Sequence, residues 1–405
     1  MAVDTDVVIA GAGPVGLALA VLLGRRGVRT LIVESRPQVT NRDESRAITW
    51  MPEGLLAADA MGVTDRLRAR AVTRRYHEFR DRPRGPALVT LDMGRLDPPH
   101  RHTLNLPQGD TEEVLESAAL ATGSVTLQRG WRVTDASDTG AGVEVRAEDA
   151  QGRTQDISAR FGAGCDGAAS TRRGVARMLG LSSDFRDYGA DSVVADLEVS
   201  ADPAPTDRSW IALASERPMG AFCFGDRRWR LVYRVNADET PDVVTSPDFV
   251  TSQLARAYPD AVVLRQLWAS VFRLGQGQTR AYSRGRWALA GDAAHAMGPS
   301  AGAGMQLGIL GAWRLSSHLH GAVLDDASWP RRAADYETGQ RHAAVMVQRS
   351  NARIFRSMAI TSRTASRVRS AVLRGAGRVP PVVVRMTKDA ALFGLAPDGQ
   401  RGEPG

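Results

Sequence analysis

Apolar positions gather near the start of the chain, where Val7 to Gly24 are 18 successive residues without a charge. The segment "DVVIAGA" is a β-branched run ending in glycine, and "PVGLALAVLLGRRG" spaces its apolar residues as a helix that ends at Gly27. About 20 apolar residues can span a bilayer. Here, however, three glycines and a proline fall within six positions, and acidic residues stand where a signal peptide is basic. The pattern predicts a strand, a turn and a helix.

The glycines of this turn have the spacing G-x-G-x-x-G, and Pro14 is the expected first residue of the helix. In such a turn Gly11 allows the tight bend, Gly13 lets a pyrophosphate approach the backbone, and Gly16 lets helix and strand pack closely. A second strand, "RTLIVE", ends on Glu34, 21 residues after Gly13. An acid at that distance accepts hydrogen bonds from a ribose hydroxyl. The segment therefore predicts a binding site for an ADP moiety.

Two later segments repeat the order of strand, turn and helix. In "RFGAGCDGAASTRRGVARMLGL" an apolar run leads to Asp166, and Arg173 follows on the next helix. In "GRWALAGDAAHAMGPSAGAGMQLGILGAWRL" the run meets Gly291 and Asp292, and a glycine-rich loop leads to a helix at about Gly304. One Asp-Gly pair predicts only a turn. Three such units in this order are far more specific.

Between these units, alternating segments such as "DSVVADLEVS", "MGAFCFG" and "RWRLVYRV" predict the strands of a separate sheet. Aromatic side chains in strands belong more often to the core than to a pocket. The candidates for either role are Trp210, Phe222, Phe224, Tyr233, Trp268 and Phe272. Alternation alone does not assign them.

Composition is that of a globular protein, with 43% hydrophobic and 24% charged residues among 405. The net charge of +7 comes from the end of the chain, because 12 basic and 3 acidic residues follow from Arg341 onward. We expect an amphipathic basic helix over residues 349–374 whose apolar stripe packs on the protein itself, rather than on a membrane or a partner. Nothing resembles a nucleic-acid-binding module, so no nucleic acid partner is predicted.

Cysteine and histidine exclude several site classes. Cys165 and Cys223 cannot form a disulfide framework, and no secretion signal or second apolar span is found, so we expect a cytoplasmic protein without integral membrane association. The histidine pairs at 100 and 102 and at 318 and 320 lack a third ligand, so we expect surface or loop positions and no metal. His295 is expected to be a packed or hydrogen-bonded group. No catalytic residue is assigned.

Taken in order, these motifs resemble the class A flavoprotein monooxygenases, single-component aromatic hydroxylases with the para-hydroxybenzoate hydroxylase fold. The resemblance covers about Asp6 to Arg341. It implies an α/β fold: a Rossmann-like FAD-binding domain of the glutathione-reductase type, an inserted β-sheet substrate domain, and a C-terminal helical tail. The implied boundaries are residues 1–75, 101–182 and 276–340 for the discontinuous FAD-binding domain, 76–100 and 183–275 for the substrate sheet, and 341–405 for the basic helical segment.

The resemblance also implies which residues bind FAD. Arg46 of "SRA" matches a flavin-contacting arginine, and the acid Asp292 matches the one that holds ribityl or ribose hydroxyls. Asp166 and Arg173 match the D-G-x-x-S-x-x-R motif, which lies near the pyrophosphates and takes part in NAD(P)H docking. The complete set of matching positions is Gly11, Gly13, Pro14, Gly16, Glu34, Arg46, Gln108, Asp166, Arg173, Gly291, Asp292, Pro299, Gly302, Gly304 and Met305.

The chain also departs from the family pattern. Where many relatives have P-P-x-G-G-Q-G-M-N, this chain has "GPSAGAGMQ", so that Ala303 removes a polar side chain and Gln306 lengthens another. These changes bear on the tuning and mobility of the flavin rather than on its binding. Gly311 stands where relatives often have aspartate, and the later Y-x-x-x-R ends at Gln340, or at Arg341 after a gap.

The activity implied by the resemblance is an FAD-dependent, NAD(P)H-consuming monooxygenase. One oxygen atom of O2 would enter an aromatic or polycyclic substrate, such as a polyketide-like secondary metabolite, through a flavin C4a-hydroperoxide that must be shielded from water. Only one dinucleotide fingerprint precedes an acid, so we expect NADPH or NADH to dock transiently near Arg46, Asp166 and Arg173.

Three alternatives remain open from the sequence. Baeyer-Villiger oxygenation of a ketone or quinone and an FAD-dependent reductase both fit the same fold. The third alternative is a protein that binds flavin without catalysis, and only Ala303 and Gln306 indicate it. Halogenation is disfavoured because W-x-W-x-I-P is absent. We expect a monomer or homodimer, since the thioredoxin-like C-terminal domain of some larger hydroxylases is not seen.

Overall fold

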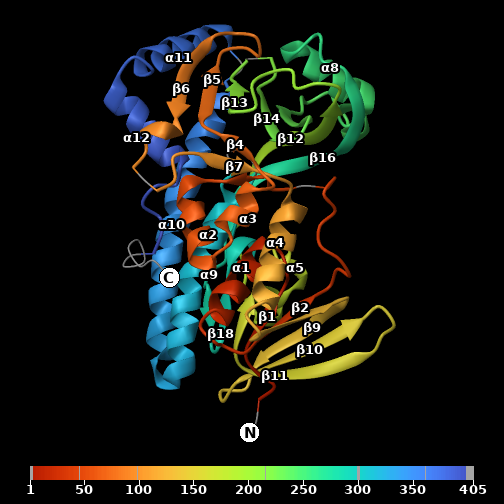
Figure 1. Cartoon of the computed structure of the whole chain (residues 1–405), viewed down its shortest axis with the longest axis vertical. Coiled ribbons are helices and arrows are strands. Elements are labelled where there is room, and N and C mark those ends of the chain that lie inside the picture. Colours follow the sequence, from red (N-terminus) through yellow and green to blue (C-terminus); the bar gives the residue numbers. More distant parts are fainter. Residues whose placement is uncertain are drawn as a thin grey trace.

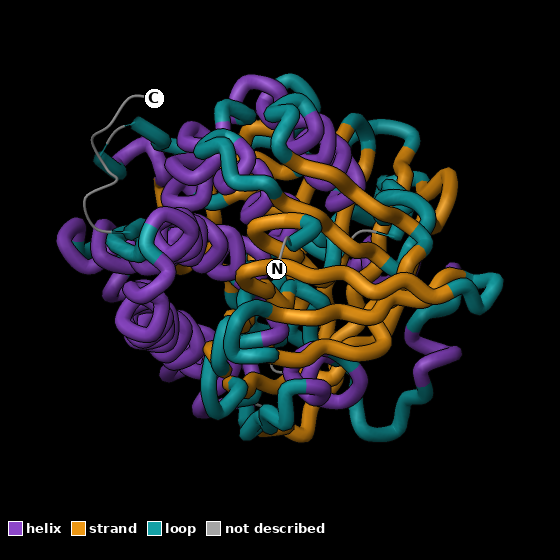
Figure 2. Tube along the Cα trace, turned by 90° about the horizontal axis from the view of Figure 1, so that it is seen from below, coloured by secondary structure: helices purple, strands orange, loops and turns teal. Residues whose placement is uncertain are grey.

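The computed structural model describes residues 3–44, 46–97, 99–214, 216–298, 302–360 and 362–397. Two large sheets lie at opposite ends of the molecule, with a small sheet between them and long helices along one side (Figure 1). The predicted α/β fold class, with an inserted sheet and a helical C-terminal region, is confirmed. Seen from below, many of the helices lie at one side of the strands, and others lie at the top of the view and at its lower right (Figure 2).

The first sheet has a parallel centre in the order β18-β11-β1-β2-β8. Strand β17 pairs antiparallel with β18, and β10 and β9 extend β11 as antiparallel neighbours. Val7, Val8 and Ile9 are fully buried, as expected of a parallel strand covered on both faces. Its strands are β1 (Thr5–Ala10), β2 (Thr30–Glu34), β8 (Val125–Arg129), β9 (Trp131–Asp138), β10 (Val143–Asp149), β11 (Thr154–Gly164), β17 (Ser283–Arg284) and β18 (Trp287–Leu289).

Helix α1 explains the long uncharged run at the start of the chain. It is buried from Gly16 to Gly24 because it packs against α4 and α9 as well as the sheet, so it has no polar face. Pro14 is its first residue, a position that needs no backbone N–H. The helices around the first sheet are α1 (Pro14–Gly24), α2 (Pro52–Met61), α3 (Thr64–Arg68), α4 (Gln108–Leu120), α5 (Ser170–Arg173), α6 (Val175–Met178), α9 (Gly304–Leu324) and α10 (Trp329–Met358).

The second sheet has the order β19-β16-β12-β15-β14-β13-β5-β6 and is antiparallel except for the pair β5 and β13. Trp210, Trp229 and Tyr233 fill its core beneath two short helices. Its strands are β5 (Tyr76–Arg80), β6 (Ala87–Asp92), β12 (Arg186–Val199), β13 (Arg208–Ala212), β14 (Met219–Gly225), β15 (Arg228–Arg234), β16 (Val263–Gln278) and β19 (His295–Met297); the helices are α7 (Pro241–Val244) and α8 (Pro247–Ala257).

The small sheet joins the two larger layers. Strands β3 (Thr49–Trp50) and β4 (Val72–Arg74) flank β7 (Thr103–Asn105), and both pair with it antiparallel. The side chain of Asn105 accepts a hydrogen bond from the hydroxyl of Thr49 and donates one to the carbonyl of Cys223 in β14. This sheet therefore fixes the position of the second sheet relative to the first.

The structure has two helices where the sequence predicted one basic helix over residues 349–374. Helix α10 runs through the predicted boundary at residue 341 and ends at Met358, and a separate helix, α11 (Arg363–Ala376), follows. Val368 and Val372 are 59% and 65% exposed, because α11 turns Arg369 toward the protein instead, where it donates to the carbonyl of Ser357. Helices α11 and α12 (Pro380–Ala390) pack against β6 (Figure 1).

Within the described ranges, no helix combines the length and the apolar character that a membrane span requires.

The prediction that the paired histidines lie on the surface or in loops needs correction. His100 is only 7% exposed, with its Nε2 2.6 Å from a carboxylate oxygen of Asp59, and His318 and His320 lie within α9 rather than in a loop.

Candidate active site

A cavity of about 1760 Å³ lies between the first sheet and the second. A single small ligand usually occupies roughly 300–1,000 Å³, so this cavity has room for two molecules. The predicted site residues that line it are Gly11, Gly13, Pro14, Glu34, Arg46, Gln108, Asp166, Arg173, Gly291, Asp292, Gly302, Gly304 and Met305. Gly16 lies outside the lining, and Pro299 lies outside the described residues.

The three glycines of the first turn have three different surroundings. Gly11 has a φ of +104°, and a Cβ there would lie 2.6 Å from the carbonyl oxygen of Cys165. A Cβ on Gly16 would lie 2.0 Å from the carbonyl oxygen of Gly11, so this glycine is needed for the close packing of α1 on the turn. A Cβ on Gly13 would meet no protein atom within 4 Å. The space beside Gly13 is open to the cavity.

Glu34 closes the same turn from the end of β2. One carboxylate oxygen accepts a 2.7 Å hydrogen bond from the backbone N–H of Ala12, and the other accepts one of 2.8 Å from that of Arg36. Burial opposes ionisation, but these backbone hydrogen bonds and the charge of Arg36 outweigh it, so the pKa of Glu34 lies below its ordinary value. A carboxylate is therefore present at the cavity wall at neutral pH.

Asp166 follows β11 on the other side of the turn. Its carboxylate accepts a 2.8 Å hydrogen bond from the backbone N–H of Val175, at the start of α6. A Cβ on Gly174 would lie 1.8 Å from that carboxylate oxygen, which explains the glycine there. Burial raises the pKa of Asp166, against the hydrogen bonds from Ser170 and Val175. This side chain holds its own loop in shape, while Arg173 reaches the cavity from α5.

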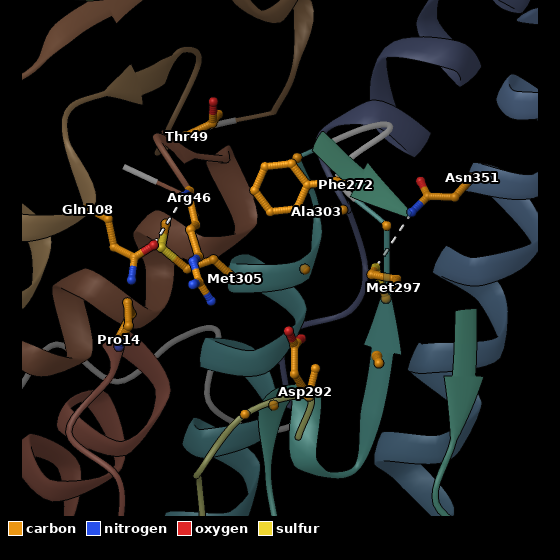
Figure 3. Close-up of a pocket in the computed structure, with 18 of the residues that line it drawn as sticks. Pro14, Arg46, Thr49, Gln108, Phe272, Asp292, Met297, Ala303, Met305 and Asn351 are labelled. Carbon is orange, nitrogen blue, oxygen red and sulfur yellow. Dashed lines mark hydrogen bonds between the residues drawn. The ribbon is translucent and has the colours of Figure 1, made fainter. Parts of the chain in front are cut away.

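Asp292 points into the cavity from the short helix η2 (Gly291–Ala293), beside the first turn of α9 (Figure 3). Its carboxylate accepts no hydrogen bond from the described residues and is open to the cavity. The surrounding walls raise its pKa to about 6 by desolvation, an effect that Arg46 partly offsets. Gly304 and Met305 place the N-terminal turn of α9 on the same wall, where free backbone N–H groups favour negative charge.

Arg46 lies across the cavity from Asp292, on a loop that strand β15 and helix α4 hold in place (Figure 3). The backbone carbonyl of Arg46 accepts a 3.2 Å hydrogen bond from Arg230 of β15, whose guanidinium also pairs with Asp196 at 2.7 Å. The next residue, Ala47, donates its N–H to the side chain of Gln108 at 3.1 Å. Gln108 is thus a support of the loop as well as a lining residue.

The other end of the cavity is lined by the second sheet and α10. Phe222 and Phe272 line it, whereas Trp210, Phe224 and Tyr233 are core residues with 1% exposure or less. Trp268 lies in neither group, with its ring 5.7 Å from that of Phe272. In Figure 3, Phe272, Met297 and Asn351 lie on the far side of the cavity from Pro14 and Gln108.

Two departures from the family pattern prove to be packing features. A Cβ on Gly311 would lie 2.7 Å from the amide nitrogen of Gln340, so the glutamine fills the space that a larger residue 311 would need. That amide nitrogen also lies 2.9 Å from Nε2 of His295, and burial lowers the pKa of His295 to about 4. Gln306 faces away from the cavity, where it donates to the carbonyl of Thr49 at 3.1 Å.

Several lining residues gave no clear signal in the sequence. They are Trp131, Arg132 and Val133 near the dinucleotide turn, and Arg74, His77, Tyr188, Met297 and Asn351 toward the second sheet and α10. Arg74 and His77 belong to short strands that mix polar and apolar residues, so neither stands out in the sequence. The others become neighbours only through the fold.

The residues present fit a bound dinucleotide. The turn offers open space at Gly13, Glu34 is ionised at the end of β2, and Asp292 has acceptor oxygens with no protein donor among the described residues. In the described part of the chain, no group of three or more histidine, cysteine, aspartate or glutamate residues has the arrangement of a metal site. The geometry points to organic cofactor chemistry.

Comparison with known proteins agrees with this geometry. The protein family described as "FAD binding domain" matches residues 4–350. A 3-(3-hydroxy-phenyl)propionate/3-hydroxycinnamic acid hydroxylase of Mycobacterium sp. (strain JLS) is 32% identical over 382 residues, which cover 93% of this chain and 64% of that protein. A 6-methylpretetramide 4-monooxygenase of Streptomyces rimosus is 33% identical over 325 residues, which cover 78% of this chain and 56% of that protein.

The fold is also shared with solved structures. The crystal structure of a p-nitrophenol 4-monooxygenase from Pseudomonas putida superposes with a TM-score of 0.87 at 24% identity, covering 97% of this chain and 99% of that one. The chain spans about 64% of the length of the hydroxylases that it resembles in sequence.

Proposed function

This chain belongs to the FAD binding domain family, and from that premise we propose that it is an FAD-dependent, NAD(P)H-consuming monooxygenase acting on an aromatic or polycyclic substrate. The observation that carries the proposal is the single cavity of about 1760 Å³, with a dinucleotide turn at one end and aromatic side chains at the other. Hydroxylation is favoured because one relative is named as a hydroxylase of 3-(3-hydroxy-phenyl)propionate and another as a 6-methylpretetramide 4-monooxygenase.

We assign the cofactor to the predicted site residues. Gly11, Gly13 and the start of α1 would receive the pyrophosphate, and Glu34 would accept hydrogen bonds from a ribose. Asp292 would accept hydrogen bonds from further hydroxyls of FAD, and Arg46 faces it across the cavity. When bound, FAD supplies the oxygen chemistry, and the protein supplies orientation and a dry cavity.

The chain's own residues have three tasks in this proposal. Asp196 and Arg230 hold the loop of Arg46 in place from the second sheet. The N-terminal turn of α9 favours negative charge beside Asp292. Phe222, Phe272 and the neighbouring strands exclude water from the substrate end. We propose that NADPH or NADH approaches at Arg173, which is exposed at the mouth of the cavity.

Product analysis under labelled molecular oxygen tests the reaction type. The protein loaded with FAD is supplied with NADPH and, in turn, with 3-(3-hydroxyphenyl)propionate and phenolic polycycles. A product that gains one labelled oxygen on an aromatic ring supports hydroxylation. A labelled ester or lactone would instead show Baeyer-Villiger oxygenation, and NADPH oxidation without incorporation in any product would refute the monooxygenase proposal.

We further propose that the protein acts in the cytoplasm as a monomer or homodimer. Both cysteines, Cys165 and Cys223, are free and buried, which suits a reducing compartment. Size-exclusion chromatography with light scattering measures the oligomeric state, and a tetramer or larger species would contradict this part of the proposal.

A further inference from the structure

Arg74 is a buried arginine that has no acidic partner in the part of the chain that the structure describes. It is 6% exposed, lies at the end of β4 and lines the cavity. Its Nε donates to the hydroxyl of Thr103 at 2.9 Å, and one terminal nitrogen donates to the hydroxyl of Ser209. Among the described residues, no carboxylate forms an ion pair with it, and burial lowers the pKa of Arg74 to about 10. Buried charges in proteins are normally neutralised by a partner or a ligand.

Two other arginines on the cavity wall are already paired with carboxylates. Arg230 pairs with Asp196, Arg273 pairs with Asp187 and Asp191, and the pairing distances are 2.6–2.8 Å. Arg74 differs because only neutral hydroxyl groups hold it. Those hydroxyls fix the direction of the guanidinium without cancelling its charge.

The small sheet places Arg74 on the side of the cavity that faces the second sheet. Arg74 pairs with Thr103 of β7, and Thr49 pairs with Asn105, two residues further along the same strand. Because β3 and β4 lie on opposite sides of β7, Arg74 and Thr49 are roughly 10 Å apart across the sheet and offset by roughly 7 Å along it. Thr49 lies close to Arg46 on the cavity wall (Figure 3). Arg74 therefore lies on the same cavity wall as Thr49 but further toward the second sheet, at the proposed substrate end.

An aromatic cluster lies beside the guanidinium. It lies 6.0 Å from the centroid of Phe222, and the ring of His77 lies 6.3 Å from that of Phe222 and 5.2 Å from that of Phe79. His77 Nδ1 lies 2.7 Å from the hydroxyl of Ser209 that also holds Arg74. Burial, helped by the nearby charge of Arg74, lowers the pKa of His77 to about 3, so His77 is neutral at pH 7. The cluster combines flat apolar walls with one positive charge.

We propose that Arg74 binds an anionic oxygen of the aromatic substrate, a carboxylate or an ionised phenol, and so selects acidic over neutral substrates. The rings of Phe222 and His77 contact the aromatic body, and the guanidinium contacts the anion. The inference rests on the proposed function for the reaction that follows, but binding selectivity can be measured without turnover.

The test measures ligand affinity on the full chain loaded with FAD, by the change in flavin absorbance. The probes are 3-(3-hydroxyphenyl)propionate, its methyl ester, and p-nitrophenol above and below its own pKa. We expect the wild-type protein to bind the acid, or the phenolate, roughly 10- to 100-fold more tightly than the matched neutral probe. Arg74→Gln should remove this preference and leave the affinity for the ester unchanged, while Arg74→Lys should retain part of it.

Arg208→Gln is the matched control, because Arg208 directly precedes Ser209 but lies outside the cavity lining and pairs with Glu78 and Asp207. Its preference should equal that of the wild type. The proposal is overturned if the wild type prefers neither anion, or if Arg74→Gln retains the full preference. If Arg74→Gln fails to fold, the wild-type comparison and Arg74→Lys still decide between these outcomes.

Reduction of FAD by NADPH separates this inference from the proposed function. Reduction of FAD by NADPH in a protein that binds neutral and anionic ligands with equal affinity would refute the role of Arg74 and leave the monooxygenase proposal standing. An anion preference that depends on Arg74, in a protein whose FAD is never reduced, would support the role of Arg74 and refute the monooxygenase proposal.

Discussion

The substitution Gly13→Val should abolish FAD binding without unfolding the protein. Gly13 has a φ of −73° and a ψ of 178°, an extended conformation that valine adopts readily. A Cβ there meets no protein atom within 4 Å, so the side chain enters the cavity where the pyrophosphate is proposed to lie. The free energy of unfolding of the flavin-free protein should therefore stay within about 1 kcal/mol of the wild type, since replacing glycine also restricts the unfolded chain.

The cofactor-bound state should respond quite differently. At a free FAD concentration of 100 times the dissociation constant, binding stabilises the wild type by about 2.7 kcal/mol, and Gly13→Val should lose all of this. Thermal unfolding with and without FAD measures the difference, together with the flavin absorbance of the purified protein. Gly375→Ala is the control, because a Cβ there also meets nothing but lies on α11, away from the cavity. A Gly13→Val protein with one yellow FAD per chain would refute the assignment of this turn.

Other substitutions test the packing and the charges of the residues around the cavity. Gly16→Ala should destabilise even the flavin-free protein by about 1–3 kcal/mol, because its Cβ would lie 2.0 Å from a backbone oxygen; unchanged denaturant unfolding would contradict this. The pKa of Asp292 is about 6 in the folded protein against an ordinary 3.8, so the folded state takes up the proton at a higher pH than the unfolded state. The flavin-free wild type should therefore gain stability relative to Asp292→Asn as pH falls from 7 to 5. Parallel stability curves for the two proteins would show that the pKa is not raised. Arg230→Met leaves Asp196 buried without its cation and should cost about 3–5 kcal/mol, measured by denaturant unfolding, with a loss below 1 kcal/mol as the contrary result. Gly311→Asp and Gln340→Arg should each destabilise the packing of α9 on α10, whereas the double variant should recover part of the loss through a new ion pair, and strictly additive losses would exclude that pairing.

The sequence predicted the parts of the fold that rest on local patterns. The turn at Gly11 to Gly16 and the acid at Glu34 follow from short spacings within one strand, turn and helix unit, and the structure has those elements. The α/β fold class followed from the order of three such units. The roles of the individual site residues remain predictions, although all but Gly16 and the undescribed Pro299 line one cavity.

What the sequence did not predict depends on contacts between distant segments. The basic segment was expected to be one helix with a packed apolar stripe, but charge and apolar spacing did not reveal that α11 would turn Arg369 inward and leave Val372 exposed. The partnership of Gly311 with Gln340 joins two helices and has no local signal. Arg74 was overlooked because its significance lies in the absence of a nearby carboxylate among the described residues, which only three-dimensional packing reveals.

The most direct test of the central claim is the absorption spectrum of the purified protein, followed under anaerobic conditions with NADPH and a bound aromatic acid and then after air is admitted. We expect flavin absorbance that bleaches with NADPH and returns when oxygen is admitted, together with formation of an oxygenated product. Bound flavin that neither NADPH nor NADH bleaches with any probe would contradict the monooxygenase claim, and no flavin after reconstitution would contradict the cofactor assignment itself.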